Sequence, residues 1–500
     1  MKRLLLSIIF VMILFVSFSQ TAFAAEQETA INSEIGYHIL VDRFNNGDSS
    51  RDEQVDLEDP FAYHGGDLQG VTDQLDHLQD FGYTTLVLSP IMENAPNGYH
   101  GYWIEDFYQV DDQFGTMEDL QELVDEAHSR DMKVVLEFVT NYVSETHPIT
   151  KDPDRNDWLK ENDGPESLQW MNSTVMLDQT NSDVQNFIKD VADYWIDETN
   201  IDGFKLHAAD QANQEFLDEL TADIHENNPD FYLLGDILDG ESYTGDLTED
   251  TAIQAADSNE LYTPMTEVFA EAGTPLTQIH ETLQNNDMQG GLNYLDNPYT
   301  ERFTNKLLEN GRKPLTGWQL ALTYLYTAPG APMIYQGSEI PMGGGSFPEN
   351  QQLVNWNSGD EELEEFTNRM AALRAEFPVL QHGDYALVDS SGAMSLFKRS
   401  YDGNAMYIAI NNDTQSQVTQ VDDISADKQM RGLLEDDIVR DNGNGQFTIG
   451  LPRESAEVYI VEDNTGLNWF VIAPIAAIFI VFVAGIIYLT RKQKKREANA

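Results

Sequence analysis

The sequence contains no cysteine among its 500 residues. This absence excludes disulfide bonds, thiolate metal sites and cysteine nucleophiles together. Basic residues are also scarce, since 28 Lys and Arg stand against 86 Asp and Glu and give a formal net charge of −58. Because so acidic a chain repels polyanions, nucleic acid is excluded as a partner.

The two longest apolar runs lie near the ends of the chain. Residues 1–24 combine a basic start at Lys2 and Arg3 with an apolar run and small residues, which is the layout of a cleavable signal peptide. A second uncharged run covers 470–490, after a link over 465–469, and the basic tail 491–500 follows it. About twenty apolar residues cross a bilayer as a helix, and a basic flank stays in the cytoplasm.

These end segments predict an exported, single-pass membrane protein. Its large N-terminal part is expected outside the cell, with a transmembrane helix over 470–490 and a cytoplasmic tail over 491–500. The lipid bilayer would then be one partner of the protein, through its C-terminal helix.

Between the ends, short apolar strands alternate with amphipathic helices. The strand-like runs are 37–44, 83–90, 133–139, 201–207, 231–237, 290–296 and 331–337, with a weaker one near 256–261. In 184–198 the apolar residues follow the 3, 4, 7 spacing of one buried helix face. Repeated strand and helix units imply a parallel sheet, so the predicted class is α/β with a (β/α)8 TIM barrel.

Two segments depart from this alternation. Residues 142–178 form a long stretch poor in helix, so we expect them to protrude as a small inserted subdomain after the third strand. From 383 to 464 the residues alternate between turn signals, which predicts a C-terminal antiparallel β-sandwich. The barrel domain is then made of 25–141 and 179–382.

Polar residues stand at the predicted carboxyl ends of the strands, where barrels of this kind hold their sites. They are Glu137, Asn141, Tyr142, Lys205, His207, Asp236, Asp296, Asn297 and Tyr299. Together with the ordered segments "VDRFNNGD", "GGDLQG", "GYHGYW", "QFGT", "YWIDETNIDGF" and "APMIYQGSE", the chain resembles the alpha-amylase family of glycoside hydrolases, family 13. The resemblance covers about residues 33–460 and implies the barrel, the inserted subdomain and the terminal sandwich.

The resemblance also implies where catalytic residues belong, and four of these positions carry other residue types. His207 stands where the family has its nucleophilic Asp, and Lys205 where it has an Arg. Asp236 aligns with the general-acid Glu, and Tyr299 with the Asp that stabilises the transition state.

These substitutions predict a loss of catalysis. A retaining glycosidase needs two carboxyl groups about 5 to 5.5 Å apart, around a transition state with cationic character. With Asp236 and Lys205 the counted charge is zero, so that cation loses its electrostatic support. Lys205 also lacks the planar guanidinium group with which Arg forms two parallel hydrogen bonds. We therefore expect a membrane-anchored pseudoenzyme that binds an α-glucan or a protein partner of the membrane or envelope.

Alternatives remain open at this stage. One is an active α-glucan hydrolase or transglycosidase with altered catalytic residues, which recruits Glu105, Asp106 or Asp210. Another is a purely structural envelope protein. A His207–Asp236 pair would suit acyl transfer beside a hydroxyl nucleophile. A metal site from His207, Asp236 and Asp210 has no ligand-spacing signature in the sequence.

Residues for sugar binding persist. His100, Tyr102 and Trp103 align with the family segment that contacts the sugar ring at the cleavage point, and Asn297 remains from the motif after the seventh strand. Aromatic faces suit the C–H surfaces of sugars, so the resemblance implies glucan binding here. Simple packing of the barrel rim is the alternative reading.

The calcium site implied by the resemblance is degraded. Asn141 is kept, whereas Met176 and Gln211 stand where an Asp and a His are expected. Because calcium needs six to eight oxygen ligands, we expect no ion at Asn141 and no cofactor.

Overall fold

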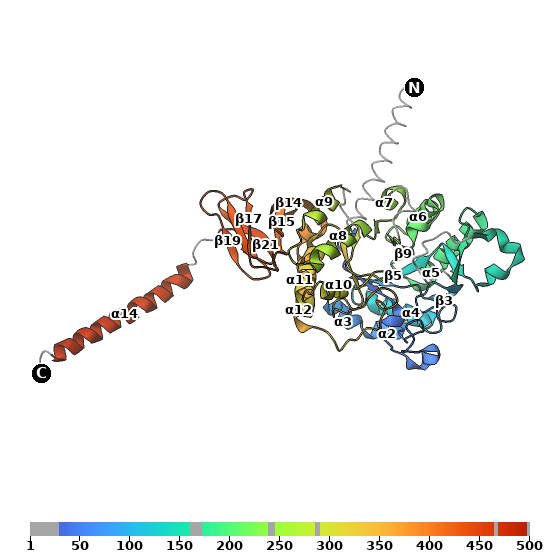
Figure 1. Cartoon of the computed structure of the whole chain (residues 1–500), viewed down its shortest axis with the longest axis horizontal. Coiled ribbons are helices and arrows are strands. Elements are labelled where there is room, and N and C mark those ends of the chain that lie inside the picture. Colours follow the sequence, from blue (N-terminus) through green and yellow to red (C-terminus); the bar gives the residue numbers. More distant parts are fainter. Residues whose placement is uncertain (1–29, 161–172, 239–245, 286–290, 465–468, 498–500) are drawn as a thin grey trace, which may run out of the picture.

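The computed structural model describes the chain except for residues 1–29, 161–172, 239–245, 286–290, 465–468 and 498–500 (Figure 1). The predicted signal peptide over 1–24 lies outside the described residues, and so does most of the predicted link over 465–469.

A closed sheet of parallel strands forms the centre of the larger domain. In the described residues its eight strands follow the order β11 (Ala255–Ala256), β10 (Tyr232–Gly235), β9 (Gly203–His207), β5 (Lys133–Val139), β2 (Thr85–Leu88), β1 (Gly36–Ile39), β13 (Ala331–Tyr335) and β12 (Leu292–Asn293). A parallel bridge between Asp257 and Leu292 joins the two ends of this order. The predicted (β/α)8 barrel is therefore confirmed.

The strands are buried along most of their length because helices cover the outer face of the barrel. β2 and β13 are buried at every position. The helices of the barrel domain are α2 (Leu68–Asp73), α3 (Leu75–Asp80), α4 (Met117–His128), α5 (Ser182–Thr199), α6 (Gln214–Asn227), α7 (Leu247–Asp250), α8 (Asn259–Ala270), α9 (Thr277–Asn285), α10 (Phe303–Glu309), α11 (Pro314–Thr327), α12 (Glu361–Glu376) and α13 (Pro378–His382).

Helix α5 shows how the sequence sets these boundaries. The Asn181 side chain accepts a hydrogen bond from the Asp183 backbone N–H and caps the start of the helix. Asn200 ends it in the left-handed conformation, which Asn tolerates better than most residues. Between them Ile188 and Trp195 are buried, so the predicted helical face over 184–198 packs on the barrel.

Short strands extend the loops at the carboxyl side of the barrel. β3 (Met92–Asn94) and β4 (Ile104–Val110) pair as an antiparallel ladder. After β5, the described part of 142–178 forms a small antiparallel sheet of β6 (Tyr142–Ser144), β8 (Thr174–Leu177) and β7 (Leu159–Lys160). This sheet lies in the segment for which the sequence predicts an inserted subdomain.

An antiparallel domain follows α13. Its larger sheet has the order β14 (Asp384–Ser391), β15 (Met394–Tyr401), β16 (Asn404–Asn411), β21 (Ser455–Asp463), β18 (Lys428–Gly432) and β19 (Ile438–Arg440), and a ladder of β17 (Gln417–Val421) and β20 (Phe447–Leu451) packs on it. Alternate residues of β15 face opposite sides, since Leu396 packs toward β17 and β20 while Phe397 joins the barrel core. The predicted C-terminal β domain is confirmed.

The last described element is the helix α14 (Trp469–Glu497). Across the described parts of the chain, no helix combines the length and the apolar character that crossing a membrane requires. This finding contradicts the predicted transmembrane helix over 470–490, and with it the predictions of a single-pass membrane protein and of a bilayer partner.

Candidate active site

The carboxyl ends of three neighbouring strands bring a group of ionisable side chains together. Glu137 lies in β5, Lys205 and His207 lie in β9, and Asp236 directly follows β10. The parallel register pairs Lys205 with Glu137 on one side and with Leu234 on the other. Since alternate residues of a strand face the same side, these four side chains converge. Each residue is at most 2% exposed.

His207 lies at the centre of this group. Its Nδ1 is 2.7 Å from Glu137 Oε1 and 2.7 Å from Asp236 Oδ2, so the two carboxyl groups flank the ring. The ring also stacks on Tyr102, with 4.4 Å between centroids. Burial alone would favour the neutral ring, but hydrogen bonds and charges of Asp236 and Glu137 raise the pKa of His207 to about 9.

The two flanking carboxyl groups are held in the ionised form. Burial opposes ionisation of Glu137, yet hydrogen bonds from His207 and His38 outweigh it and lower its pKa to about 2. Burial likewise opposes ionisation of Asp236, but Lys205 and His207 hold its pKa well below the ordinary value.

Asp257 is a further carboxylate that the sequence reasoning missed. It directly follows β11, and its Oδ2 lies 2.9 Å from Lys205 Nζ, which is also 3.5 Å from Asp236 Oδ1. Burial raises the pKa of Asp257 to about 8, against the lowering effect of Lys205. Asp257 lies within the weak strand predicted near 256–261, and a carboxylate in a predicted barrel strand was the signal that could have found it.

Tyr299, in the segment after β12, covers the group. Its hydroxyl lies 3.1 Å from His207 Nδ1, 3.1 Å from Asp236 Oδ2 and 3.2 Å from Glu137 Oε1. The Tyr102 hydroxyl is 2.7 Å from the Tyr299 hydroxyl and donates to Glu137 Oε1 at 3.0 Å. The four catalytic positions predicted from the resemblance, at Lys205, His207, Asp236 and Tyr299, therefore lie together.

The predicted sugar-binding residues pack against the same group. His100 and Tyr102 are buried and stack with 5.3 Å between ring centroids, and Trp103 meets His100 edge to face at 4.8 Å. Burial lowers the pKa of His100 to about 3, so this ring is neutral. Asn297 accepts a hydrogen bond from the Tyr299 backbone N–H at 2.9 Å. Packing at the barrel rim is thus observed, and glucan binding by these residues stays a prediction.

Asn141 is engaged by other protein groups. Its Nδ2 donates to the Ala208 carbonyl at 2.8 Å, and its Oδ1 accepts from Gln179 at 2.9 Å. Met176 pairs with Tyr142 in the small sheet. The expected absence of a calcium ion at Asn141 stays a prediction.

Each carboxylate named for the alternative of altered chemistry has a hydrogen-bond partner of its own. Glu105 accepts a hydrogen bond from the Thr146 hydroxyl, and Asp106 accepts from the Tyr108 backbone N–H. Asp210 is buried and accepts from the Leu238 backbone N–H at 3.0 Å. Asp257 pairs with Lys205, which also faces Asp236.

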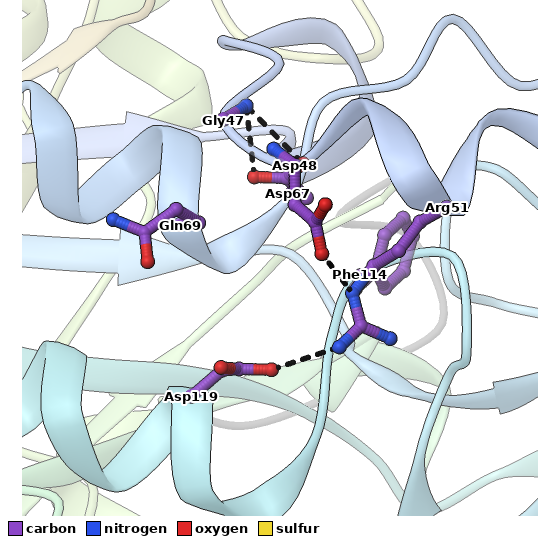
Figure 2. A pocket seen from close by; sticks show the side chains of 7 residues that line it. All are labelled: Gly47, Asp48, Arg51, Asp67, Gln69, Phe114 and Asp119. Carbon is purple, nitrogen blue, oxygen red and sulfur yellow. Dashed lines mark hydrogen bonds and ion pairs between the residues drawn. The ribbon is translucent and has the colours of Figure 1, made fainter.

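A separate polar pocket of about 200 Å³ lies between the loop after β1 and α4 (Figure 2). It is lined by Gly47, Asp48, Arg51, Asp67, Gln69, Phe114 and Asp119. Arg51 Nε is 3.2 Å from Asp48 Oδ2, and its Nη2 is 3.1 Å from Asp119 Oδ2 (Figure 2). The guanidinium thus pairs with two carboxylates, and these ion pairs connect the loop after β1 to α4.

Family descriptions and solved structures match the chain along most of its length. The alpha amylase catalytic domain matches residues 38–172 and 158–376, and the alpha-amylase C-terminal domain matches 383–459. An alpha-amylase of Anoxybacillus is 38% identical, with a TM-score of 0.83 over 87% of this chain and 99% of that chain. The alpha-amylase of Geobacillus thermoleovorans, solved with acarbose, is 37% identical, with a TM-score of 0.81 over the same shares.

Curated relatives share lower identity. A beta/alpha-amylase of Paenibacillus polymyxa is 29% identical over 455 residues, which are 85% of this chain but 37% of that protein. The chain therefore spans little more than a third of that relative's length. A cyclomaltodextrinase of a Bacillus species is 28% identical over 420 residues, which are 77% of this chain and 73% of that protein.

These relatives contradict the expectation of a pseudoenzyme that has lost hydrolysis, because they are named as amylases and cyclomaltodextrinases. The physical reason lies in the carboxylates. Among the four substituted catalytic positions, only Asp236 is a carboxylate. The folded chain places two more carboxylates, Glu137 and Asp257, in the same buried group. On the matches to both of its domains, the chain belongs to the alpha-amylase family.

Proposed function

We propose that the protein is an α-glucan hydrolase or transglycosidase whose chemistry is carried by altered residues, the buried carboxylates Glu137, Asp236 and Asp257. The supporting observation is the separation of the first two. Glu137 Oε1 and Asp236 Oδ2 each lie 2.7 Å from His207 Nδ1, and one oxygen of each carboxyl group lies within 4.8 Å of one oxygen of the other. Retaining glycosidases place their two carboxyl groups about 5 to 5.5 Å apart, so this pair lies somewhat closer together than double displacement needs.

Each carboxylate of the pair is fixed through a second contact. Glu137 accepts from the Tyr102 hydroxyl at 3.0 Å, and Asp236 faces Lys205 at 3.5 Å through its other oxygen. In this assignment Lys205 is a positioning residue and the two carboxylates flank the anomeric carbon. Because both carboxylates are ionised, the protonated His207 ring donates the proton to the leaving oxygen. Such preorganised negative groups stabilise a cationic transition state at the moment it forms.

Tyr299 lies where a glucan would approach the two carboxylates. The Tyr299 hydroxyl lies 3.1 Å from Asp236 and 3.2 Å from Glu137, so it covers the space between them. A glucan reaches the pair only when Tyr299 turns away. The side chain is partly exposed, unlike the carboxylates beneath it, so in this proposal it is the part of the site that moves.

The substrate class is supported by the relatives. The Geobacillus thermoleovorans amylase was solved with acarbose, and the Bacillus relative is named for cyclomaltodextrins. His100, Tyr102 and Trp103 supply the aromatic surface beside the carboxylates on which a glucose ring would pack.

The test is turnover of starch, maltodextrin, pullulan and cyclomaltodextrin by the full chain, with release of reducing ends and a chromatogram of the products. Asp236→Asn and Glu137→Gln are expected to lower kcat by about 10⁴-fold or more, the order seen when one member of a hydrolase's catalytic set is removed.

The matched control is Glu34→Gln. Glu34 is another buried carboxylate of the barrel, but it lies at the opposite end, where it accepts from the Tyr232 hydroxyl at 2.8 Å and pairs with Lys133 at 2.7 Å. This variant should keep its kcat if it folds. A native chain without turnover on any of the four glucans, or an Asp236→Asn variant with native kcat, would refute the proposal.

A further inference from the structure

We infer that the group around His207 is a binding site for a divalent transition-metal ion, with Zn²⁺ as the best match. The ligand atoms are His207 Nδ1, Glu137 Oε1, Asp236 Oδ2 and the Tyr299 hydroxyl oxygen. They come from β9, from β5, from the residue after β10 and from the segment after β12. Imidazole nitrogen and carboxylate oxygen are the usual zinc ligands beside thiolate.

Five of the six distances among the four atoms are slightly shorter than the edge of a zinc-centred tetrahedron. From His207 Nδ1 the distances are 2.7 Å to each carboxylate and 3.1 Å to Tyr299. From the Tyr299 oxygen they are 3.1 Å to Asp236 and 3.2 Å to Glu137. Zinc with ligand distances of about 2.0 to 2.1 Å gives tetrahedral edges of about 3.3 Å, so the ligands need to move outward by only a few tenths of an ångström.

The available protons are too few to form a hydrogen bond along every short contact in this group. The single proton on His207 Nδ1 can lie on one of the three lines to Glu137, Asp236 and Tyr299. The Tyr299 hydroxyl also has one proton, and it faces the same two carboxylates and the Tyr102 hydroxyl. A central cation would interact with every one of these lone pairs at once.

Burial makes the balance of charge decisive. The side chains of Glu137, Asp236 and His207 are 0% exposed, and buried charges need to be paired. Two carboxylates and a neutral imidazole match a divalent ion, while Lys205, 3.5 Å from Asp236, is paired with Asp257 at 2.9 Å. One ligand is a nitrogen and there are only four ligands. Both features favour zinc over calcium or magnesium, which prefer six or more oxygen ligands.

An outer layer of contacts aims the ligand oxygens at one point. Glu137 Oε2 lies 3.4 Å from His38 Nε2, and Asp236 Oδ1 lies 3.5 Å from Lys205 Nζ. Lys205 is held in turn by Asp257 at 2.9 Å. Each carboxylate therefore turns one oxygen outward to a protein partner and the other toward His207, which is how outer residues orient metal ligands.

The inference does not depend on the proposed glucan activity. The ion would engage Glu137 and Asp236, the same carboxylates that we assign to glucan turnover. Metal and glucan are therefore expected to exclude one another, and a chelator should raise turnover of a chain that carries the ion.

The experiment uses the full chain, stripped with a chelator and titrated with Zn²⁺. Bound metal is measured by mass spectrometry after gel filtration, and Co²⁺ in place of Zn²⁺ reports tetrahedral ligation by its visible absorption. One equivalent is expected for the native chain and none for His207→Ala or Asp236→Asn. Tyr299→Phe removes one ligand atom and is expected to weaken binding by about tenfold or more.

The matched control is His128→Gln. His128 forms a single His–carboxylate pair with Asp202, at 2.8 Å on the outside of the barrel, so it tests whether any such pair binds zinc. This variant should keep one equivalent. A native chain that binds no stoichiometric metal refutes the inference even if it turns over glucan, and so does a folded His207→Ala variant that still binds one equivalent. Metal binding without glucan turnover would refute only the proposed function.

Discussion

The buried carboxyl group of Glu339 should make the stability of the protein fall as the pH rises. Glu339 lies just after β13, is 2% exposed, and accepts a hydrogen bond from the Tyr37 hydroxyl at 2.8 Å. Burial raises its pKa from 4.5 to about 7, although Tyr37 and Arg302 act in the opposite direction. Folding therefore favours the protonated form of this side chain.

The magnitude follows from linkage between protonation and folding. The contribution of Glu339 is fully present below pH 4.5, the ordinary value, and is lost as the pH rises through about 7. At 1.36 kcal/mol for each pKa unit, the difference between 4.5 and about 7 corresponds to about 3 kcal/mol. Above pH 7 the native chain should be less stable by that amount than the same chain with a neutral group at this position.

The perturbation is Glu339→Gln, which keeps an oxygen for the Tyr37 hydroxyl and removes the ionisation. Urea unfolding of both chains at pH 5 and pH 8 gives the free energies of unfolding. Between these two values the native chain should lose about 2.5 kcal/mol more than the variant, because a part of the effect is already lost at pH 5. Glu365→Gln, on the exposed side of α12, is the matched control and should follow the native chain. Equal pH dependence of the native chain and Glu339→Gln would refute the reasoning.

The remaining predictions concern stability and are checked by chemical unfolding of each variant. Ile188→Ala leaves a cavity beneath α5 and should cost about 2 to 5 kcal/mol, so a loss below 1 kcal/mol would contradict the packing. Thr116→Ala removes one half of the capping box that Thr116 and Asp119 form on α4, and should cost about 1 kcal/mol. Gly101→Ala places a Cβ 2.1 Å from the Pro90 carbonyl oxygen at a φ of +87°, so it should cost more than about 1 kcal/mol, and an unchanged midpoint would exclude this close approach.

The barrel and the C-terminal sheet could be predicted because local patterns of apolar residues in the sequence indicate their strands. Apolar runs such as 133–139 and 331–337 can bury nearly every residue only as central strands, and alternation between turn signals after 383 indicates antiparallel strands. The resemblance to the alpha-amylase family then located the strand ends. A contrary case is the run over 470–490, whose composition suggested a membrane span that the structure does not support.

The sequence by itself thus determined the two domains and the strand ends at which His207, Lys205 and Asp236 stand. Only the tertiary structure decided which other groups surround them. Closure of the barrel brings Asp257 to Lys205, and the loop after β12 lays Tyr299 over His207. These contacts join residues far apart in the chain, and their distances depend on strand register and burial, which no local pattern records.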